Sequence, residues 1–248
     1  MAPNHISLTK ITKKIIKEKK EEIPDDYAFP FPELAAHESA TIVLVEVRSE
    51  VQKMADRTVE MFDRVQAGFS DAKIFRENHY EKLTKEEALL DKMQVELTAY
   101  LLKCQSLSIS ESQRKTINTM LATVTELEEL SDQCLTVGVF ISRMEEKKLV
   151  IQSEDREKLL PYIELVRELL YFVYRHIGNE LSKEQLDFAN SMEEQIDEER
   201  TALKKVARTR LEQGSDVRAE LLYIDIVRKV EKMGDSCFAI ARQLGGRG

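Results

Sequence analysis

The chain has 248 residues, of which 42% are hydrophobic and 33% are charged, with only 8 glycines, 5 prolines and no tryptophan. This composition is typical of an all-α protein with solvated, charged helix faces, and the length is sufficient to bury a sizeable core. The formal net charge of -8 argues against general nucleic-acid binding, which depends on a basic surface, so cations are the more fitting ligands.

The cysteines and the uncharged runs indicate a cytoplasmic protein without a membrane span in these residues. Cys104, Cys134 and Cys237 form no Cys-x-x-Cys pair and are too few for a disulfide framework, which fits a reducing compartment. The longest uncharged runs fall well short of the roughly 18–20 apolar residues that cross a bilayer. Lysines interrupt the apolar residues near the start, so the chain does not open like a signal peptide.

Residues 1–34 are expected to be a basic lead-in followed by a proline-rich linker. The lead-in, residues 1–23, is amphipathic and lysine-rich. It could lie on an anionic membrane surface or lead away from a membrane anchor, or it could be a solvated helical tail. Pro24, Pro30 and Pro32 disfavour helix in the segment that follows, and we expect the folded region to begin at residue 35.

Residues 35–150 contain the patterns of three helices. The first covers 35–67, where Gly68 ends a long amphipathic pattern, and the second covers 71–104. Thr84 to Glu87 has the form of a capping box, so an interruption of the second helix near Leu83 and Thr84 is expected. Ser110 to Gln113 has the same form and opens the third helix, which extends to about residue 149.

Residues 151–248 repeat this plan with three further helices. The fourth covers 153–177 and is kinked or delayed by Pro161, the fifth is capped by Ser182 and extends to about residue 211, and the sixth follows Gly214. No segment has a convincing strand pattern. The predicted fold is therefore all-α, a tandem of two antiparallel three-helix bundles that cover residues 35–150 and 151–248.

The last helix of each set has a related sequence. Residues 222–237 carry apolar residues at helical spacing, with Glu231 and Asp235 one turn apart. Residues 127–134 match 230–237 in the order of apolar, acidic and cysteine positions. Such a recurrence indicates an internal repeat.

Four Glu-x-x-x-Asp pairs lie on the second and third helices of the two sets. The offset is 106 residues between the two second helices and 103 residues between the two third helices. Two carboxylates one turn apart repel each other unless a positive charge lies between them, and two such pairs from neighbouring helices would suit iron, manganese or magnesium. The candidate metal ligands are Glu87, Asp91, Glu128, Asp132, Glu193, Asp197, Glu231 and Asp235. In a chain with 45 acidic residues, simple solvated charge is the alternative for each pair, and Glu129 and Glu194 leave the register of two pairs open.

Other chemistry has little support in the sequence. None of the four histidines stands in a His-Glu-x-x-His or Glu-x-x-His arrangement, so the imidazole ligands of zinc proteases and ferritin-type di-iron bundles are missing. The glycines form no phosphate-binding loop. No nucleophile stands beside a base, so we expect no enzyme activity; a carboxylate-bridged di-metal enzyme is kept as a remote alternative.

The acidic helices resemble those of PhoU domains. Residues 230–235, Val-Glu-Lys-Met-Gly-Asp, followed by Ala-Ile-Ala at 239–241, are similar to the Leu-Glu-Arg-Ile-Gly-Asp signature of that family. Residues 127–132 are the counterpart in the first half, and the segments 87–91 and 193–197 are similar to the family's other acidic motif. The resemblance implies two three-helix bundles in tandem, and it implies metal clusters on the acidic motifs, as in some members.

The match has departures that bear on the site. Lys232 and Glu129 stand where the family has arginine. Ser131 stands where the first half of the family has glycine, so the resemblance supports a metal site less well in the first bundle. Residues 98–102, Thr-Ala-Tyr-Leu-Leu, resemble the version of the domain that is fused behind bacterial sodium/phosphate cotransporters.

This resemblance implies a cytosolic, PhoU-like regulatory domain of sodium-dependent phosphate transport, at the cytoplasmic face of the membrane. Its partner would be a membrane phosphate transporter, fused or separate, and a homodimer is an open alternative. A helical adaptor that binds protein partners without metal is the second hypothesis. The two differ in whether the carboxylates of Glu231 and Asp235 bind a metal ion.

Overall fold

The computed structural model describes residues 40–149, 151 and 153–246. In these residues the chain forms seven α-helices and no strand, which confirms the all-α prediction. Three predictions lie outside the described residues: the lead-in and linker at 1–34, the start of the folded region at 35, and residue 150 as the last residue of the first bundle. The helices are α2 (Ala40–Gly68), α3 (Ala72–Asn78), α4 (Tyr80–Cys104), α5 (Glu111–Lys147), α6 (Ser153–His176), α7 (Lys183–Glu212) and α8 (Val217–Leu244).

Several helix ends lie where the sequence predicts them. Ser110 and Ser182 each begin a helix with a complete capping box, in which the hydroxyl accepts a backbone N–H and a glutamine three residues later reaches back. Gly68 is the last residue of α2. α6 already begins at Ser153 and continues through Pro161, so the proline does not delay that helix.

The predicted interruption near Leu83 and Thr84 is wrong, because the chain breaks four residues earlier, at His79. Asp71 caps the short helix α3, and His79 joins it to α4 with the non-helical torsions φ -121° and ψ -26°. Thr84 lies inside α4, and its hydroxyl donates to the Tyr80 carbonyl at 3.1 Å. Leu83 is fully buried, so the packing of this turn outweighs the capping-box pattern.

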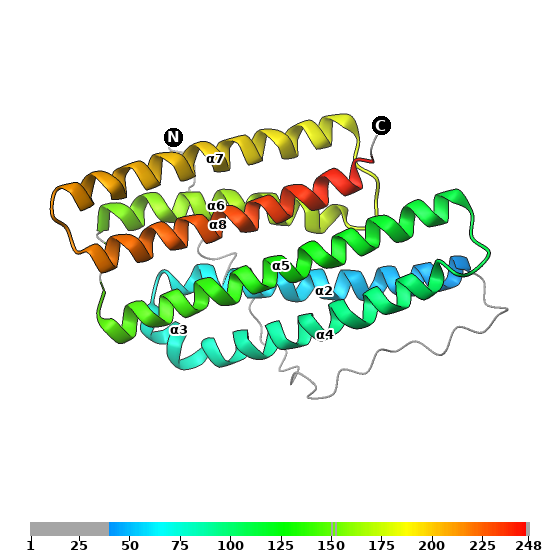
Figure 1. The fold of residues 1–248 in the computed structure, drawn as a ribbon, viewed down its shortest axis with the longest axis horizontal. Coiled ribbons are helices and arrows are strands. Elements are labelled where there is room, and N and C mark those ends of the chain that lie inside the picture. Colours follow the sequence, from blue (N-terminus) through cyan, green and yellow to red (C-terminus); the bar gives the residue numbers. More distant parts are fainter. Residues whose placement is uncertain (1–39, 150, 152, 247–248) are drawn as a thin grey trace, which may run out of the picture.

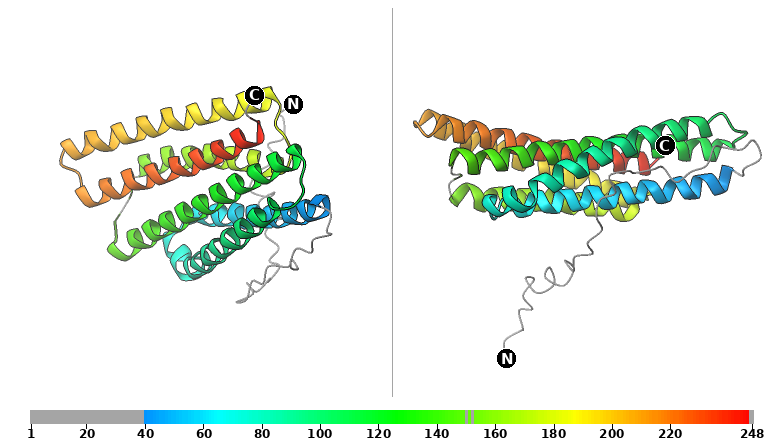
Figure 2. Two further views of the ribbon diagram at one scale, coloured as in Figure 1. Left: turned by 45° about the vertical axis from the view of Figure 1, so that its right-hand side comes forward. Right: turned by 90° about the horizontal axis from the view of Figure 1, so that it is seen from below.

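The six long helices form two layers. α7, α8, α5 and α4 lie side by side in one layer, and α6 and α2 lie behind them (Figures 1 and 2). α6 packs against both α7 and α8, while α2 packs against both α4 and α5. Each set of three long helices is thus a bundle, and α5 packs along α8 to join the two bundles.

The two bundles share one continuous hydrophobic core. The buried apolar side chains include Val47, Met54 and Phe62 of α2, Cys134 of α5 and Cys237 of α8. An apolar stripe on each helix faces the other helices of its bundle, as the helical spacing requires. The long helices therefore owe their stability to shared burial across both bundles.

Two polar contacts between α5 and α8 follow the internal repeat. Lys229 of α8 donates to the Gln133 side chain of α5 at 2.8 Å, and Glu126 of α5 forms a hydrogen bond with Ser236 of α8. Glu126 and Lys229 are equivalent under the 103-residue offset, and so are Gln133 and Ser236. The two contacts therefore form one arrangement repeated about an approximate two-fold axis between α5 and α8.

A buried ion triad closes one end of the second bundle. Arg210 of α7 forms ion pairs with Asp155 of α6 and, at 2.8 Å, with Glu220 of α8. The two carboxylate side chains are only 5% and 6% exposed, so this arginine offsets two negative charges that have little water around them.

No helix in the described part of the chain is both long enough and apolar enough to cross a membrane.

Candidate functional site

The structure brings the four acidic candidates of the first bundle together between α4 and α5. Glu87 and Asp91 come from α4, and Glu128 and Asp132 come from α5; we call these four residues the α4–α5 cluster. The carboxyl groups of Glu128 and Asp91 approach each other across the two helices. The two acidic pairs of the first bundle therefore lie near each other across neighbouring helices.

The α4–α5 cluster has an unfavourable electrostatic environment. Burial and the nearby carboxylates of Asp91 and Asp132 raise the pKa of Glu87 above its ordinary value. Burial raises the pKa of Glu128 as well, with further contributions from Asp91, Glu129 and Asp132. None of the four carboxylates of the cluster forms an ion pair within the described residues. The cluster therefore has negative charge that the described protein does not neutralise.

The second bundle holds the corresponding α7–α8 cluster, which consists of Glu193 and Asp197 on α7 and Glu231 and Asp235 on α8. Arg200 of α7 lies within this group. Its guanidinium forms an ion pair with Glu231 and lies 3.5 Å from Asp197. An arginine therefore supplies positive charge to this cluster, and the ion pair with Glu231 joins α7 to α8.

The arginine moderates the pKa shifts of the α7–α8 cluster. Burial and the carboxylate of Asp197 raise the pKa of Asp235, while Lys232 and Arg200 act in the opposite direction. Burial, Asp197 and Asp235 raise the pKa of Glu193, and Arg200 again lowers it. The same repulsion exists in both bundles, but only the second contains a bound counter-ion among the described residues.

The structure also settles which acidic residues belong to the clusters. Glu129, the neighbour of Glu128, is exposed and accepts a hydrogen bond from Gln133 at 2.6 Å. Glu194, the neighbour of Glu193, is exposed and accepts one from Asn190 at 2.8 Å. The register that the sequence left open is therefore that of Glu128 and Glu193.

Ser131 and Gly234, which are equivalent under the repeat, pack differently. A Cβ atom on Gly234 would lie 3.2 Å from two methyl carbons of Ile196, so a side chain there would press on α7. Ser131 is fully buried, and its hydroxyl donates to the Glu128 carbonyl at 2.8 Å. The first bundle accommodates a side chain at this position without exposing its hydroxyl.

Comparison with solved structures identifies the fold. PhoU from Pseudomonas aeruginosa superimposes with a TM-score of 0.76 at 13% identity, covering 83% of this chain and 97% of that one. The phosphate transport system regulatory protein PhoU from Streptococcus pneumoniae gives 0.71 at 16% identity, with coverages of 83% and 95%. A PhoU-like protein from Shewanella oneidensis gives 0.55 at 14% identity, with coverages of 84% and 97%.

The chain has the PhoU fold. This confirms the predicted all-α helical-bundle architecture. No family model and no curated protein sequence matches the chain. The PhoU likeness is therefore carried by the arrangement of the helices and extends over almost the whole length of each of these solved proteins.

Within this PhoU fold the two clusters differ in their suitability for a metal ion. Four carboxylates are the oxygen donors that hard cations prefer, and the α4–α5 cluster offers them without a competing cation in the described residues. In the α7–α8 cluster, Arg200 already engages Glu231 and Asp197. As placed, no group of three or more His, Cys, Asp or Glu side chains in the described part of the chain could hold a metal ion.

Sequence reasoning missed the role of Arg200. The residue stands three positions after Asp197, and this spacing brings it onto the same helix face as the carboxylate. That spacing was the available signal, because a basic residue at i+3 from an acidic one can be its counter-ion. The contact with Glu231 across to α8 had no signal in the sequence, since it depends on how the two helices pack.

Proposed function

We propose that this chain is a regulatory component of phosphate uptake that acts by binding a membrane phosphate transporter, without catalysis. The observation that carries the proposal is the match of its two bundles to PhoU from P. aeruginosa over 97% of that protein. The S. pneumoniae protein of the same fold is described as a phosphate transport system regulatory protein. The charged outer faces of the helices offer a surface for contacts with such a partner.

We further propose that the transporter is sodium-dependent and that the chain acts at the cytoplasmic face of the membrane. Two sequence features support this: residues 98–102 resemble the version of the domain fused to sodium/phosphate cotransporters, and residues 1–23 are basic. The transporter is either fused to this chain or separate from it. A homodimer would present the same partner-binding surface twice.

Phosphate uptake in cells that lack this chain tests the proposal. Uptake of radiolabelled phosphate is measured at high external phosphate, in sodium medium and in potassium medium, with and without the chain restored. We expect uptake to change on deletion in sodium medium only and to return on complementation. Unchanged uptake in both media would overturn the proposed function, whereas an equal change in both would overturn only the sodium dependence.

We propose in addition that the Glu-x-x-x-Asp pairs bind iron, manganese or magnesium, most tightly in the α4–α5 cluster. The support is the concentration of carboxylates with raised pKa values and no counter-ion among the described residues. Side-chain rearrangement would bring Glu87, Asp91, Glu128 and Asp132 onto one ion, whose charge would replace their mutual repulsion with attraction. The bound ion would act as a cross-link between α4 and α5.

Metal analysis of protein purified without chelator tests this assignment. The wild type is compared with Asp132→Ala and with Asp235→Ala, one variant for each bundle. We expect the first substitution to lower the metal content and the second to lower it less. Equal metal content in all three proteins would rule out both clusters as sites.

The second candidate function is a helical adaptor that binds protein partners without metal. The ion pair of Arg200 with Glu231 favours it, because this contact neutralises a cluster carboxylate with the protein's own side chain. Under this hypothesis, substitution of Glu87 and Glu128 by glutamine leaves thermal stability unchanged or raises it, whether or not manganese is added. Loss of stability in the variant only when manganese is present would contradict the adaptor hypothesis.

A further inference from the structure

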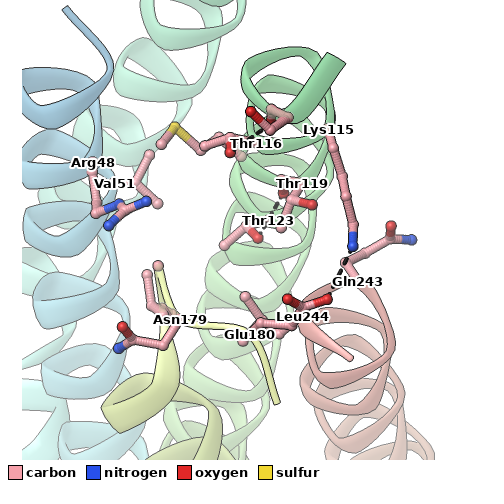
Figure 3. Close-up of a pocket in the computed structure, with 14 residues that line it drawn as sticks. Arg48, Val51, Lys115, Thr116, Thr119, Thr123, Asn179, Glu180, Gln243 and Leu244 are labelled. Atoms are coloured by element: carbon pink, nitrogen blue, oxygen red, sulfur yellow. Dashed lines mark hydrogen bonds and ion pairs between the residues drawn. The ribbon is translucent and has the colours of Figure 1, made fainter. Parts of the chain in front are cut away.

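A cavity of about 320 Å³ lies between the two bundles, away from both carboxylate clusters. Its walls come from α2 and α5 of the first bundle and from the α6–α7 connection and the end of α8 in the second (Figure 3). This volume is in the range of pockets that bind small organic molecules. A molecule bound there would contact both bundles at once.

Part of the wall is apolar. Val51, Met120, Ile177 and Leu244 line the cavity and are between 2% and 8% exposed. These side chains come from four different segments of the chain and would cover the apolar body of a ligand. Inorganic phosphate alone would leave this surface unused, so the cavity suits an organic molecule.

The remaining wall is rich in hydrogen-bond donors. The side chains of Arg48, Thr119, Asn179 and Gln243 line it, and none of them has a hydrogen-bond or ion-pair partner within the described residues. Figure 3 shows Arg48 on one side of the cavity and Lys115, which pairs with Glu180 at 2.9 Å, on the other. Because Glu180 offsets Lys115, the lining residues carry one net positive charge, that of Arg48, in a chain with a net charge of -8.

The packing around Arg48 fixes its position. Gly178, in the α6–α7 connection, has φ of +80°, and a Cβ atom on it would lie 2.9 Å from Cδ of Arg48. The absence of a side chain at Gly178 therefore lets the arginine stem pass over the backbone of the second bundle. The guanidinium reaches the cavity from α2 because of this close approach.

The hydroxyl groups that line the cavity are specific to this half of the repeat. Ser112, Thr116, Thr119 and Thr123 lie along one face of α5. Their counterparts at the 103-residue offset are Ser215, just before α8, and Ala219, Leu222 and Ile226 within it. Three of the four hydroxyls are thus replaced by apolar side chains in the duplicated helix, so the fold does not require them. Thr116 and Thr123 donate to carbonyls one turn earlier, which leaves Thr119 with a free hydroxyl proton among the described residues.

We propose that this cavity binds a small organic phosphate, with the phosphoryl oxygens on Arg48 and Thr119 and the organic part on the apolar wall. A phosphate ester has three terminal oxygens, so a guanidinium and a hydroxyl can each donate to a different oxygen, with more freedom than the two oxygens of a carboxylate allow. The proposal goes beyond the proposed transport function and depends neither on it nor on metal binding.

Isothermal titration calorimetry with phenyl phosphate tests the proposal. We expect saturable binding to the wild type, and an affinity lower by about tenfold or more for Arg48→Gln, because the bond lost is charge-assisted. Thr119→Val, which keeps the side-chain volume, is expected to weaken binding by about threefold to tenfold. Inorganic phosphate and neutral benzyl alcohol each lack one half of the ligand and are expected to bind more weakly than phenyl phosphate.

Arg208→Gln is the matched control, since Arg208 is exposed on α7 and has no partner within the described residues. Its affinity for phenyl phosphate should equal that of the wild type, and circular dichroism should show that all three variants are folded. Three results would overturn the proposal: no saturable binding, an equal loss in Arg208→Gln, or benzoate binding as tightly as phenyl phosphate.

Discussion

The two carboxylate clusters occupy equivalent positions of the sequence repeat, but they differ in how their negative charge is neutralised. In the α7–α8 cluster, Arg200 forms an ion pair with Glu231 and approaches Asp197. In the α4–α5 cluster, Glu87 and Glu128 have raised pKa values, and no basic residue of the described chain pairs with the cluster. The acidic positions are thus the same in both halves of the repeat, while the source of positive charge differs.

The ranking of the two clusters as metal sites differs between the family signature and the structure. By its sequence, the helix with Gly234 and Asp235 matches the PhoU motif better than its first-half counterpart with Ser131 and Asp132. In the structure, the better-matching helix α8 receives its counter-ion from Arg200 of α7, and the poorer-matching helix α5 has no counter-ion among the described residues. Similarity of a motif therefore does not rank the two clusters as cation sites, because the counter-ion comes from another helix.

The largest expected effect concerns Arg200. Arg200→Gln removes the partner of Glu231, whose side chain is 13% exposed, and leaves the carboxylates of the α7–α8 cluster unneutralised. We expect the free energy of unfolding to fall by about 3 kcal/mol, as for other ion pairs that lose one partner in a mostly buried setting. Urea denaturation measures it, with Arg208→Gln on the same helix as a control that should change stability by less than about 0.5 kcal/mol. Equal stability of the two variants would mean that the ion pair contributes nothing.

The second prediction concerns the stabilisation of the protein by manganese, which should depend on the α4–α5 cluster more than on the α7–α8 cluster. Added Mn²⁺ at about a hundred times its dissociation constant should stabilise the chelator-treated wild type by about 2.7 kcal/mol, because the ion binds only the folded state. Glu128→Gln combined with Asp132→Asn should remove this stabilisation, whereas Glu231→Gln combined with Asp235→Asn should retain most of it. Thermal unfolding with and without Mn²⁺ gives the answer, and the reverse ranking would place the metal site in the second bundle.

A smaller effect is expected on changing the pH of the metal-free protein. Burial first, and then the neighbouring carboxylates, raise the pKa values of Glu87 and Glu128 above the ordinary 4.5 in the folded state. The folded state therefore binds more protons than the unfolded state, so stability falls as the pH rises through the folded pKa and recovers on acidification toward about 4.5. Denaturation at about pH 5.5 and about pH 7 should show higher stability at the lower pH.

The matched variant for this pH effect is Glu87→Gln combined with Glu128→Gln. Without the two titrating groups, the stability difference between the two pH values should shrink. Glu193→Gln should shrink it less, because Arg200 partly offsets the raised pKa of Glu193. A difference that stays the same in both variants would assign the pH dependence to other groups.

The smallest effect is the removal of one negative charge from the α4–α5 cluster. Glu128→Gln should raise the stability of the metal-free protein at neutral pH by about 0.5 kcal/mol, since like charges one turn apart on a helix destabilise it by about that amount. Glu129→Gln is the control, because Glu129 is exposed and its replacement can still accept the hydrogen bond from Gln133. Thermal unfolding in the presence of chelator measures both, and a loss of stability in Glu128→Gln would show that the cluster is not under repulsion.

Sequence patterns such as capping boxes predicted several helix ends, because the hydrogen bonds that form them join residues close together in the chain. The capping boxes at Ser110 and Ser182 satisfy backbone donors within three residues, and they begin helices as predicted. The similar pattern at Thr84 fails, because Leu83 is drawn into the core and the helix continues through both residues. Neither the approach of Glu87 to Asp132 nor the contact of Arg200 with Glu231 was predictable from the sequence, because both depend on how neighbouring helices pack.

The sequence by itself determined the helices, their duplication and the acidic positions, since periodicity, caps and repeat offsets are properties of neighbouring residues. Only the tertiary structure decided that Glu128 and Glu193 face the partner helix, that Arg200 neutralises one cluster, and that Arg48 and Thr119 line a common cavity. The physical reason is that electrostatic and packing energies depend on distances between helices, and the packing of the two bundles sets those distances.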